Sequence, residues 1–154
     1  RDFCLSRGLG DVYKRQANIH SVKSYFDANM DMLDPQKFYS LLYANQKVYT
    51  RVKNEESTYF DQTSEVKNSQ FASGSIIKGY VEHSIVSRNC HIEVGARVKN
   101  SILSPKAIIG EGAIVENAII DKLVEVTPGV TIKGTQEEPM VVAKGTKVIE
   151  DMIR

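Results

Sequence analysis

The sequence predicts a mainly β protein in which short parallel strands coil into a β-helix, preceded by a short helical segment. Three observations predict this fold. Aliphatic residues recur after steps of 5, 6 and 6 residues, so that the pattern repeats every 17. A small or β-branched residue stands two places before nearly every one of them, and a polar turn-forming residue recurs at one position of each period. We expect the repeating rungs to lie between about Val66 and Ile132.

The repeat is clearest in three segments that begin at Val81, Val98 and Val115, because 98 minus 81 and 115 minus 98 both equal 17. A step of six residues turns a side chain by about 600° around an α-helix, so it cannot form one apolar stripe. Short strands on the three sides of a coil satisfy the spacing instead. The predicted large interior residues are Val66, Phe71, Ile77, Val81, Val86, Ile92, Val98, Leu103, Ile109, Val115, Ile120, Val126 and Ile132.

Each predicted strand also carries a smaller residue to the interior, since side chains two residues apart on a strand point the same way. These smaller residues are Ser69, Ser75, Ser84, Cys90, Ala96, Ser101, Ala107, Ala113, Ala118, Val124 and Val130. Stacked turns bury one another's backbone edges, so about three turns are needed for stability, and the repeat meets that condition. Each fully buried aliphatic side chain contributes roughly 1.5–3 kcal/mol, so the aliphatic rows can supply a core.

Polar residues mark the corners of the predicted coil. Asn68, His83, Asn100 and Asn117 occupy equivalent positions and should stack as a column of turn-forming side chains. Glycines at positions 74, 79, 95, 110, 112 and 129 supply backbone freedom where the chain turns.

Residues 17–65 lack the repeat and begin with helical patterns. The segment Ser21–Leu33 spaces its apolar residues by three and four, which predicts one helix with Val22, Tyr25, Phe26, Asn29 and Met30 on its inner face. Asp34 as N-cap and Pro35 at the first helical position predict a second helix. That helix should carry Phe38, Leu41 and Leu42 inward, and Tyr49–Tyr59 should follow as extended or irregular chain.

Residues 1–16 resemble a processing scar. Back-translation of Asp11–Gln16 gives the sequence of a transposon end used in DNA library preparation, and Ser6–Gly10 fits the attached adapter in the same frame. We therefore exclude 1–16 as non-native.

Cys90 then remains as the one native cysteine, which fits a reducing compartment. Removing four basic and two acidic residues from 20 and 19 leaves 16 and 17, a charge of −1 that offers no argument for nucleic acid or anionic membrane as partner.

The repeat resembles the left-handed parallel β-helix of hexapeptide-repeat proteins, and its left-handed sense is implied by that resemblance alone. Downstream of the repeat, Glu137-Glu138-Pro139 reads as a loop and Met140–Ala143 as a closing strand. Lys144–Ile149 should cap the open end of the coil, which would otherwise expose unpaired backbone groups. We therefore expect the β-helix and its cap to span residues 66–149.

The segment Ser24–Leu33 resembles the stretch that closes the nucleotidyltransferase domain of bacterial glucose-1-phosphate adenylyltransferases. The resemblance implies that residues 17–65 are the end of that domain and a linker. Members of that family make ADP-glucose from ATP and glucose 1-phosphate with Mg²⁺, for glycogen synthesis. No stretch approaches the roughly 20 apolar residues that span a bilayer, so a cytoplasmic location without membrane contact is expected.

The chain departs from that family at an informative place. Catalytic members carry Asp-Val-Gly-Thr before the motif tyrosine, and its Asp binds the metal; here the equivalents are Asn18 to Ser21. The resemblance is therefore closest to a regulatory-type second subunit that pairs with a catalytic adenylyltransferase subunit as a hetero-oligomer. The family's nucleotide, metal and sugar-phosphate groups would lie upstream of Ala17, so we expect an inactive C-terminal fragment without catalytic, cofactor-binding or metal residues. Mg²⁺ and ATP are implied for the catalytic family only.

Two alternatives stay open. A hexapeptide-repeat acyltransferase would use a histidine as general base beside acyl-coenzyme A. The predicted coil holds only His83, which fits the corner column, and His91, whose side chain should point outward. A purely structural oligomerisation domain is the other alternative, and it differs mainly in having no regulatory role.

Overall fold

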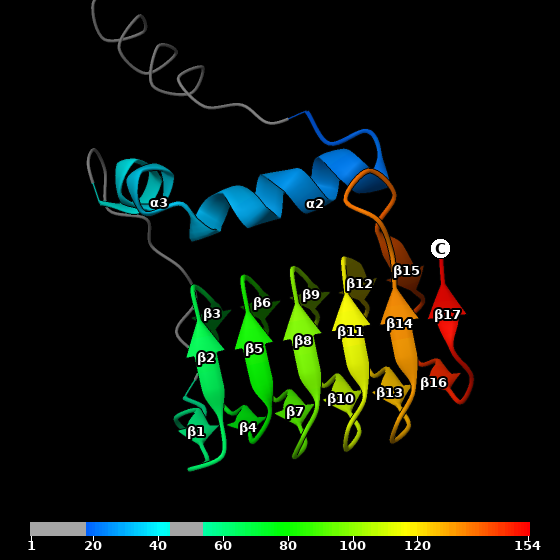
Figure 1. Cartoon of the computed structure of the whole chain (residues 1–154). Coiled ribbons are helices and arrows are strands. Elements are labelled where there is room, and N and C mark those ends of the chain that lie inside the picture. Colours follow the sequence, from blue (N-terminus) through cyan, green and yellow to red (C-terminus); the bar gives the residue numbers. More distant parts are fainter. Residues whose placement is uncertain (1–17, 44–53) are drawn as a thin grey trace, which may run out of the picture.

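The computed structural model describes residues 18–43 and 54–154, and in these ranges short parallel strands form a β-solenoid with a helical segment along one side (Figure 1). The predicted mainly β fold is confirmed. The left-handed sense of the coil, implied by the family resemblance, stays a prediction. The proposed adapter residues 1–16 lie outside the described part of the chain. No helix within the described ranges is long and apolar enough to cross a membrane.

Three parallel sheets form the sides of the solenoid. Sheet A consists of β1 Tyr59–Phe60, β4 Ile76–Ile77, β7 His91–Ile92, β10 Ile108–Ile109, β13 Glu125–Val126 and β16 Lys147–Val148. Sheet B consists of β2 Glu65–Lys67, β5 Tyr80–Glu82, β8 Arg97–Lys99, β11 Ile114–Glu116, β14 Thr131–Lys133 and β17 Met152–Ile153. Sheet C consists of β3 Gln70–Phe71, β6 Ile85–Val86, β9 Ile102–Leu103, β12 Ala118–Ile120 and β15 Met140–Val142.

The interior of the solenoid matches the predicted register. From Ile77 to Ile132, every predicted large interior residue is fully or almost fully buried, and the smaller ones from Ser75 to Val130 are buried with them. Val66 is 38% exposed and Phe71 half-buried, so these two interior assignments fail in part. Both residues lie in the first turn, and β2 and β3 each have a partner strand on one side only within the described ranges.

The corner column is confirmed by its backbone and its hydrogen bonds. Asn68, His83, Asn100 and Asn117 have φ angles of 38°, 46°, 45° and 48°, a left-handed conformation that Asn tolerates better than most residues. The Nδ1 atom of His83 lies 3.0 Å from Oδ1 of Asn100, and the Asn100 amide donates to Oδ1 of Asn117. The Asn117 amide then donates to the Gly134 carbonyl at 3.2 Å, so the column continues into the next turn.

The solenoid runs further than the repeat predicts. At its start, Phe60 pairs with Ile77 before the expected first rung. At its end, the predicted closing strand is β15, which pairs with β12. The predicted cap contains β16, which pairs with β13, and β17 continues the solenoid to Ile153. The expected limits of 66 and 149 therefore lie inside the solenoid. Phe60 precedes Ile77 by the full 17 residues, whereas the last turn keeps the pairing at the longer separations of Val126 from Val148 and of Ile132 from Met152.

Two helices and a short 3-10 turn precede the solenoid. Helix α2, Val22–Met30, begins after the Ser21 N-cap, whose hydroxyl accepts from the Ser24 N–H. The 3-10 turn η1 covers Asp31–Leu33, and helix α3, Pro35–Leu42, begins after the predicted Asp34 cap. Phe38 and Leu42 of α3 are half-buried. Residues 54–58 are irregular as predicted, and positions 49–53 of that expected segment lie outside the described residues.

Candidate functional site: the helix-covered face of the coil

The outer face of sheet C carries a row of isoleucines. Ile85 pairs with Ile102, and Ile102 pairs with Ile119, so the three side chains stack in register on neighbouring strands. Each directly precedes a buried interior residue and therefore points away from the interior. Nevertheless, Ile102 is only 4% exposed and Ile119 only 8%. Something other than the solenoid interior must bury these outward side chains.

Helix α2 and the turn η1 bury this row. Phe26, Met30 and Leu33 are spaced by four and three residues, so they lie on one side of the helical segment. They form one apolar cluster with Ile102 and Ile119, and Ile85 packs against its edge. Figure 1 shows α2 running along the solenoid on this side. Each fully buried side chain of this kind contributes roughly 1.5–3 kcal/mol, so the contact is substantial.

The predicted inner face of the helix was partly wrong. Val22 is 47% exposed and Tyr25 is 38% exposed, whereas Phe26 and Met30 are buried. The spacing of three and four residues placed these four on one stripe together with Asn29, which is half-buried. The row of isoleucines is narrow, however, and it covers only the side of the helix that carries Phe26 and Met30.

Polar contacts fasten the helical segment at both ends. The Gln70 side-chain amide donates to the Met32 carbonyl within η1 at 2.6 Å. Near the start of α2, the Lys23 amine lies 2.9 Å from the Asp27 carboxylate and 3.8 Å from that of Glu137. Glu137 belongs to the loop between β14 and β15, which extends beside the helix (Figure 1). Because these charges are exposed, they orient the helix more than they stabilise it.

The helical layer also carries apolar side chains that the solenoid does not cover. Ile19, just before α2, is 56% exposed, and Val22 and Tyr25 are exposed on the flank of α2 beside Phe26. The rings of Tyr39 in α3 and of Tyr43, just after it, stack with their centroids 5.9 Å apart and remain largely exposed. The apolar surface of the helical layer is therefore wider than the part that the solenoid covers.

The structure places the two solenoid histidines where the sequence predicted. His83 is held in the corner column by Asn100, and His91 lies on the outer face of sheet A, in register between Ile76 and Ile108. The acyltransferase alternative needs a histidine free to act as a base in a substrate pocket. In this structure Asn100 engages the Nδ1 atom of His83, and His91 lies between two isoleucines.

The segment that the family resemblance aligns with a metal-binding motif, Asn18–Ser21, lies just before α2 and supplies its N-cap. Asn18 is exposed, and its carbonyl oxygen lies 3.2 Å from Nδ1 of His20. The His20 N–H donates to the Ser24 hydroxyl, beside the Ser21 cap. No group of three or more His, Cys, Asp or Glu residues in ranges 18–43 and 54–154 could hold a metal ion.

Comparison with known proteins gives a family and several relatives. Residues 51–150 match the model of the family described as GlmU-like, C-terminal hexapeptide. The chain is 41% identical over 129 residues to the glycogen biosynthesis protein GlgD of Bacillus subtilis, and 45% identical over 119 residues to that of Geobacillus stearothermophilus. These matches cover 84% and 77% of the chain, but 38% and 35% of the relatives. The chain thus spans little more than a third of their length.

Weaker similarity extends to an enzyme and to solved structures. A glucose-1-phosphate adenylyltransferase of Bacillus cytotoxicus is 31% identical over 84 residues, which is 54% of this chain and 22% of the enzyme. The structure of PerB from Caulobacter crescentus in complex with CoA and GDP-perosamine superimposes with a TM-score of 0.58 and 19% identity. That match covers 63% of this chain and 48% of PerB. At this identity it shows a shared fold and nothing about activity.

Proposed function

We propose that this chain, which belongs to the GlmU-like C-terminal hexapeptide family, is the C-terminal part of a cytoplasmic subunit in ADP-glucose and glycogen synthesis. Its role there is assembly and regulation beside a catalytic glucose-1-phosphate adenylyltransferase subunit. The identity of 41–45% with proteins named for glycogen biosynthesis supports this pathway. The match to the adenylyltransferase is shorter and weaker, which favours the regulatory-type subunit over the enzyme.

The observation that carries the regulatory role is the apolar surface of the helical layer that the solenoid leaves uncovered. Phe26 and Met30 of α2 pack on the solenoid, while Val22 and Tyr25 on the neighbouring flank of the helix are exposed. The longer relatives contain further chain that can cover this flank. A helix that contacts both the solenoid and this further chain couples the two bodies, because a shift of the solenoid moves the helix against its other contact. A partner bound to the solenoid would thereby change the population of states of the rest of the subunit.

The proposed non-catalytic role follows from residue chemistry. Mg²⁺ prefers charged oxygen ligands, and the neutral amide of Asn18 cannot replace the carboxylate that the resemblance expects at this position. The catalytic subunit would then hold the Mg²⁺ and ATP, and this chain would contribute contacts rather than reacting groups.

Co-expression tests this proposal. The gene should be extended upstream to the length of the relatives and expressed with the catalytic subunit, and the complex analysed by size-exclusion chromatography with light scattering. We expect a hetero-oligomer in which the rate or substrate affinity of the catalytic subunit changes. The double variant Val22→Ser, Tyr25→Ser should weaken this change, whereas Ile108→Ser on the uncovered face of sheet A serves as the matched control. A chain that stays monomeric and leaves the partner's kinetics unchanged would contradict the proposal.

The 154-residue chain alone gives a second test. It should form no ADP-glucose from ATP and glucose 1-phosphate at any Mg²⁺ concentration. Turnover by the purified chain would show that reacting groups lie within it.

A further inference from the structure

One corner of the solenoid is two residues shorter than its neighbours. Interior residues of sheets A and B are six apart between Ile92 and Val98 and between Ile109 and Val115, but four apart between Ile77 and Val81. The short corner is Lys78-Gly79. Gly79 is buried, and a Cβ on it would lie 2.4 Å from the Ala96 carbonyl oxygen. The backbone therefore passes tightly beneath the next corner, and only glycine fits.

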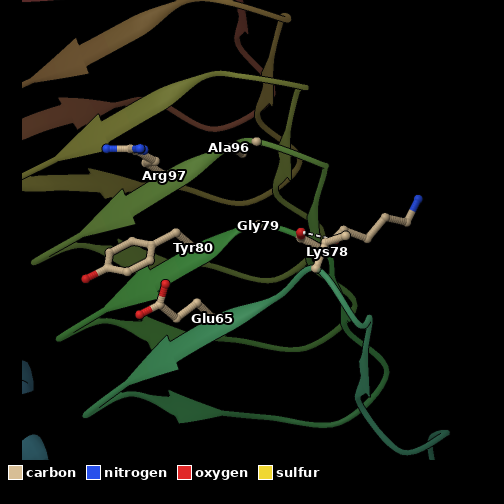
Figure 2. Close-up of a pocket in the computed structure, with 8 residues that line it drawn as sticks. Glu65, Lys78, Gly79, Tyr80, Ala96 and Arg97 are labelled. Atoms are coloured by element: carbon tan, nitrogen blue, oxygen red, sulfur yellow. Dashed lines mark hydrogen bonds between the residues drawn. The ribbon is translucent and has the colours of Figure 1, made fainter.

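The missing residues leave a notch in the surface of about 420 Å³. Gly79, Gly95 and Ala96 are among the residues that line it. Figure 2 shows Arg97, Tyr80 and Glu65 projecting from successive strands of sheet B on one side, while Lys78 extends the other way. The notch is thus lined by the glycine and alanine residues of the corners and by side chains from two adjacent faces of the solenoid.

The short corner also removes a hydrogen-bond acceptor. In the regular turns, the Gly112 N–H donates to the Val94 carbonyl at 3.1 Å, and the Gly129 N–H donates to the Glu111 carbonyl at 2.9 Å. Gly95 is the equivalent donor one turn earlier, as 112 minus 95 equals 17. The carbonyl it would reach belongs to the residues that this corner lacks, and its N–H has no acceptor among the described residues. Gly95 is exposed, so this N–H faces solvent and is open to an oxygen atom of a ligand.

Arg97, two residues after Gly95, adds an unshared positive charge at the rim of the notch. It is exposed and in register with Tyr80, and no carboxylate of the described ranges pairs with it. The nearby acids have other partners. Glu65 lies 2.8 Å from the Lys67 amine, Glu93 lies 2.8 Å from the Lys78 amine, and Asp61 accepts from the Thr63 N–H and hydroxyl.

The last turn also has a short corner, but its hydrogen bonding differs. Val148 and Met152 are four residues apart, and there the Thr131 N–H donates to a carboxylate oxygen of Asp151 at 2.7 Å. At the Lys78-Gly79 corner the equivalent donor is the Glu65 N–H, which donates to the Gly79 carbonyl at 3.3 Å. The N–H without an acceptor at the notch is therefore that of Gly95, in the following turn.

We propose that the notch at Lys78-Gly79 binds an oxyanion, the phosphate or carboxylate group of a small ligand. Gly95 donates its N–H to one oxygen, and Arg97 donates from its guanidinium to the same group. Guanidinium binds carboxylate and phosphate in a bidentate manner with charge-assisted hydrogen bonds, which suits this arrangement. The site does not depend on the proposed function, because its residues lie on sheets A and B, away from the helix-covered face.

Nuclear magnetic resonance of the ¹⁵N-labelled chain tests the site. The protein is titrated with inorganic phosphate, and separately with acetate, at an ionic strength held constant with chloride. We expect a saturable shift of the Gly95 amide, and the anion that saturates at lower concentration identifies the preferred group. Arg97→Gln should weaken the apparent affinity about tenfold or more, whereas Arg154→Gln, at the other end of the solenoid, should leave it unchanged.

An insertion provides an independent test. Adding Val-Gly between Lys78 and Gly79 gives this corner the same number of residues as Glu93–Ala96, so it should fill the notch and supply the missing carbonyl. The anion-dependent shift of Gly95 should then disappear while the chain stays folded. The proposal is overturned if Gly95 does not respond to either anion, or if Arg97→Gln responds as strongly as the unmodified chain. If the insertion prevents folding, the arginine variants alone decide between these outcomes.

Discussion

The outer faces of sheets B and C have the same parallel strand arrangement but differ in what covers them. Sheet C carries isoleucines on consecutive turns, which α2 buries. Sheet B carries a column of alternating charge, in register from strand to strand: Lys67, Glu82, Lys99, Glu116 and Lys133. The Lys99 amine lies 3.1 Å from the Glu82 carboxylate, and that of Lys133 lies 2.9 Å from Glu116.

This difference shows that interior and outward rows of side chains have separate roles. The interior rows are alike behind both faces, and their burial stabilises the coil. The outward row decides whether a face stays in water or receives another element, because apolar side chains gain free energy on burial while paired charges lose their hydration. Alternating charges also favour the correct strand register, since like charges would otherwise lie directly opposite each other.

The largest effect is expected for a charge in the interior. Val98→Asp would bury a carboxylate without a partner, at a cost of several kcal/mol against a total stability of about 5–15 kcal/mol, so the coil should unfold. Circular dichroism and thermal melting measure this. Ile108→Asp is the matched control, since Ile108 is 42% exposed and should tolerate the change. Equal tolerance at both positions would disprove the register.

A smaller and more local effect is expected on the helix-covered face. Ile102→Ala should cost about 2 kcal/mol, at the low end for such truncations, because α2 can shift to fill the gap. Hydrogen exchange should show faster exchange in α2 and little change in the strands. Ile114→Ala, outward and half-buried on sheet B, should change stability by only about 0.5 kcal/mol. Similar exchange of α2 amides in both variants would refute the proposed division of faces.

The smallest effect concerns the charged column. Hydrogen bonds from Lys99 and Tyr80 lower the pKa of Glu82 below its usual 4.5. A lowered folded-state pKa stabilises the protein above the unfolded value, and this contribution disappears as the pH falls through the folded value. The melting temperature should therefore fall slightly below about pH 4.5, and less so in Glu82→Gln. High salt should reduce the difference between the two proteins. Identical acid profiles would show that the column does not contribute.

Sequence periodicity was enough to predict the interior because burial in a stacked coil repeats with the chain. Ile109 and its equivalents in the other turns have the same kinds of neighbours, so the position of a residue in the repeat determines its surroundings. The Asn100 corner and the Asp34-Pro35 helix start were predictable for a similar reason, since both depend on local backbone geometry. The row at Ile85, Ile102 and Ile119 is visible in the same repeat, but its role is not, because an outward isoleucine that another element buries has the same local sequence pattern as one that stays in water.

The sequence by itself thus determined the parallel coil, its interior rows, its corners and the presence of two helices. The tertiary structure decided that α2 lies on sheet C, that Val22 and Tyr25 face outward, and that Gly79 passes beneath the next corner to leave a notch. Local periodicity cannot specify these features, because each depends on which outward surfaces meet across long stretches of chain. Packing between an apolar helix side and an apolar strand row is chosen by shape and burial, and those exist only once both elements have formed.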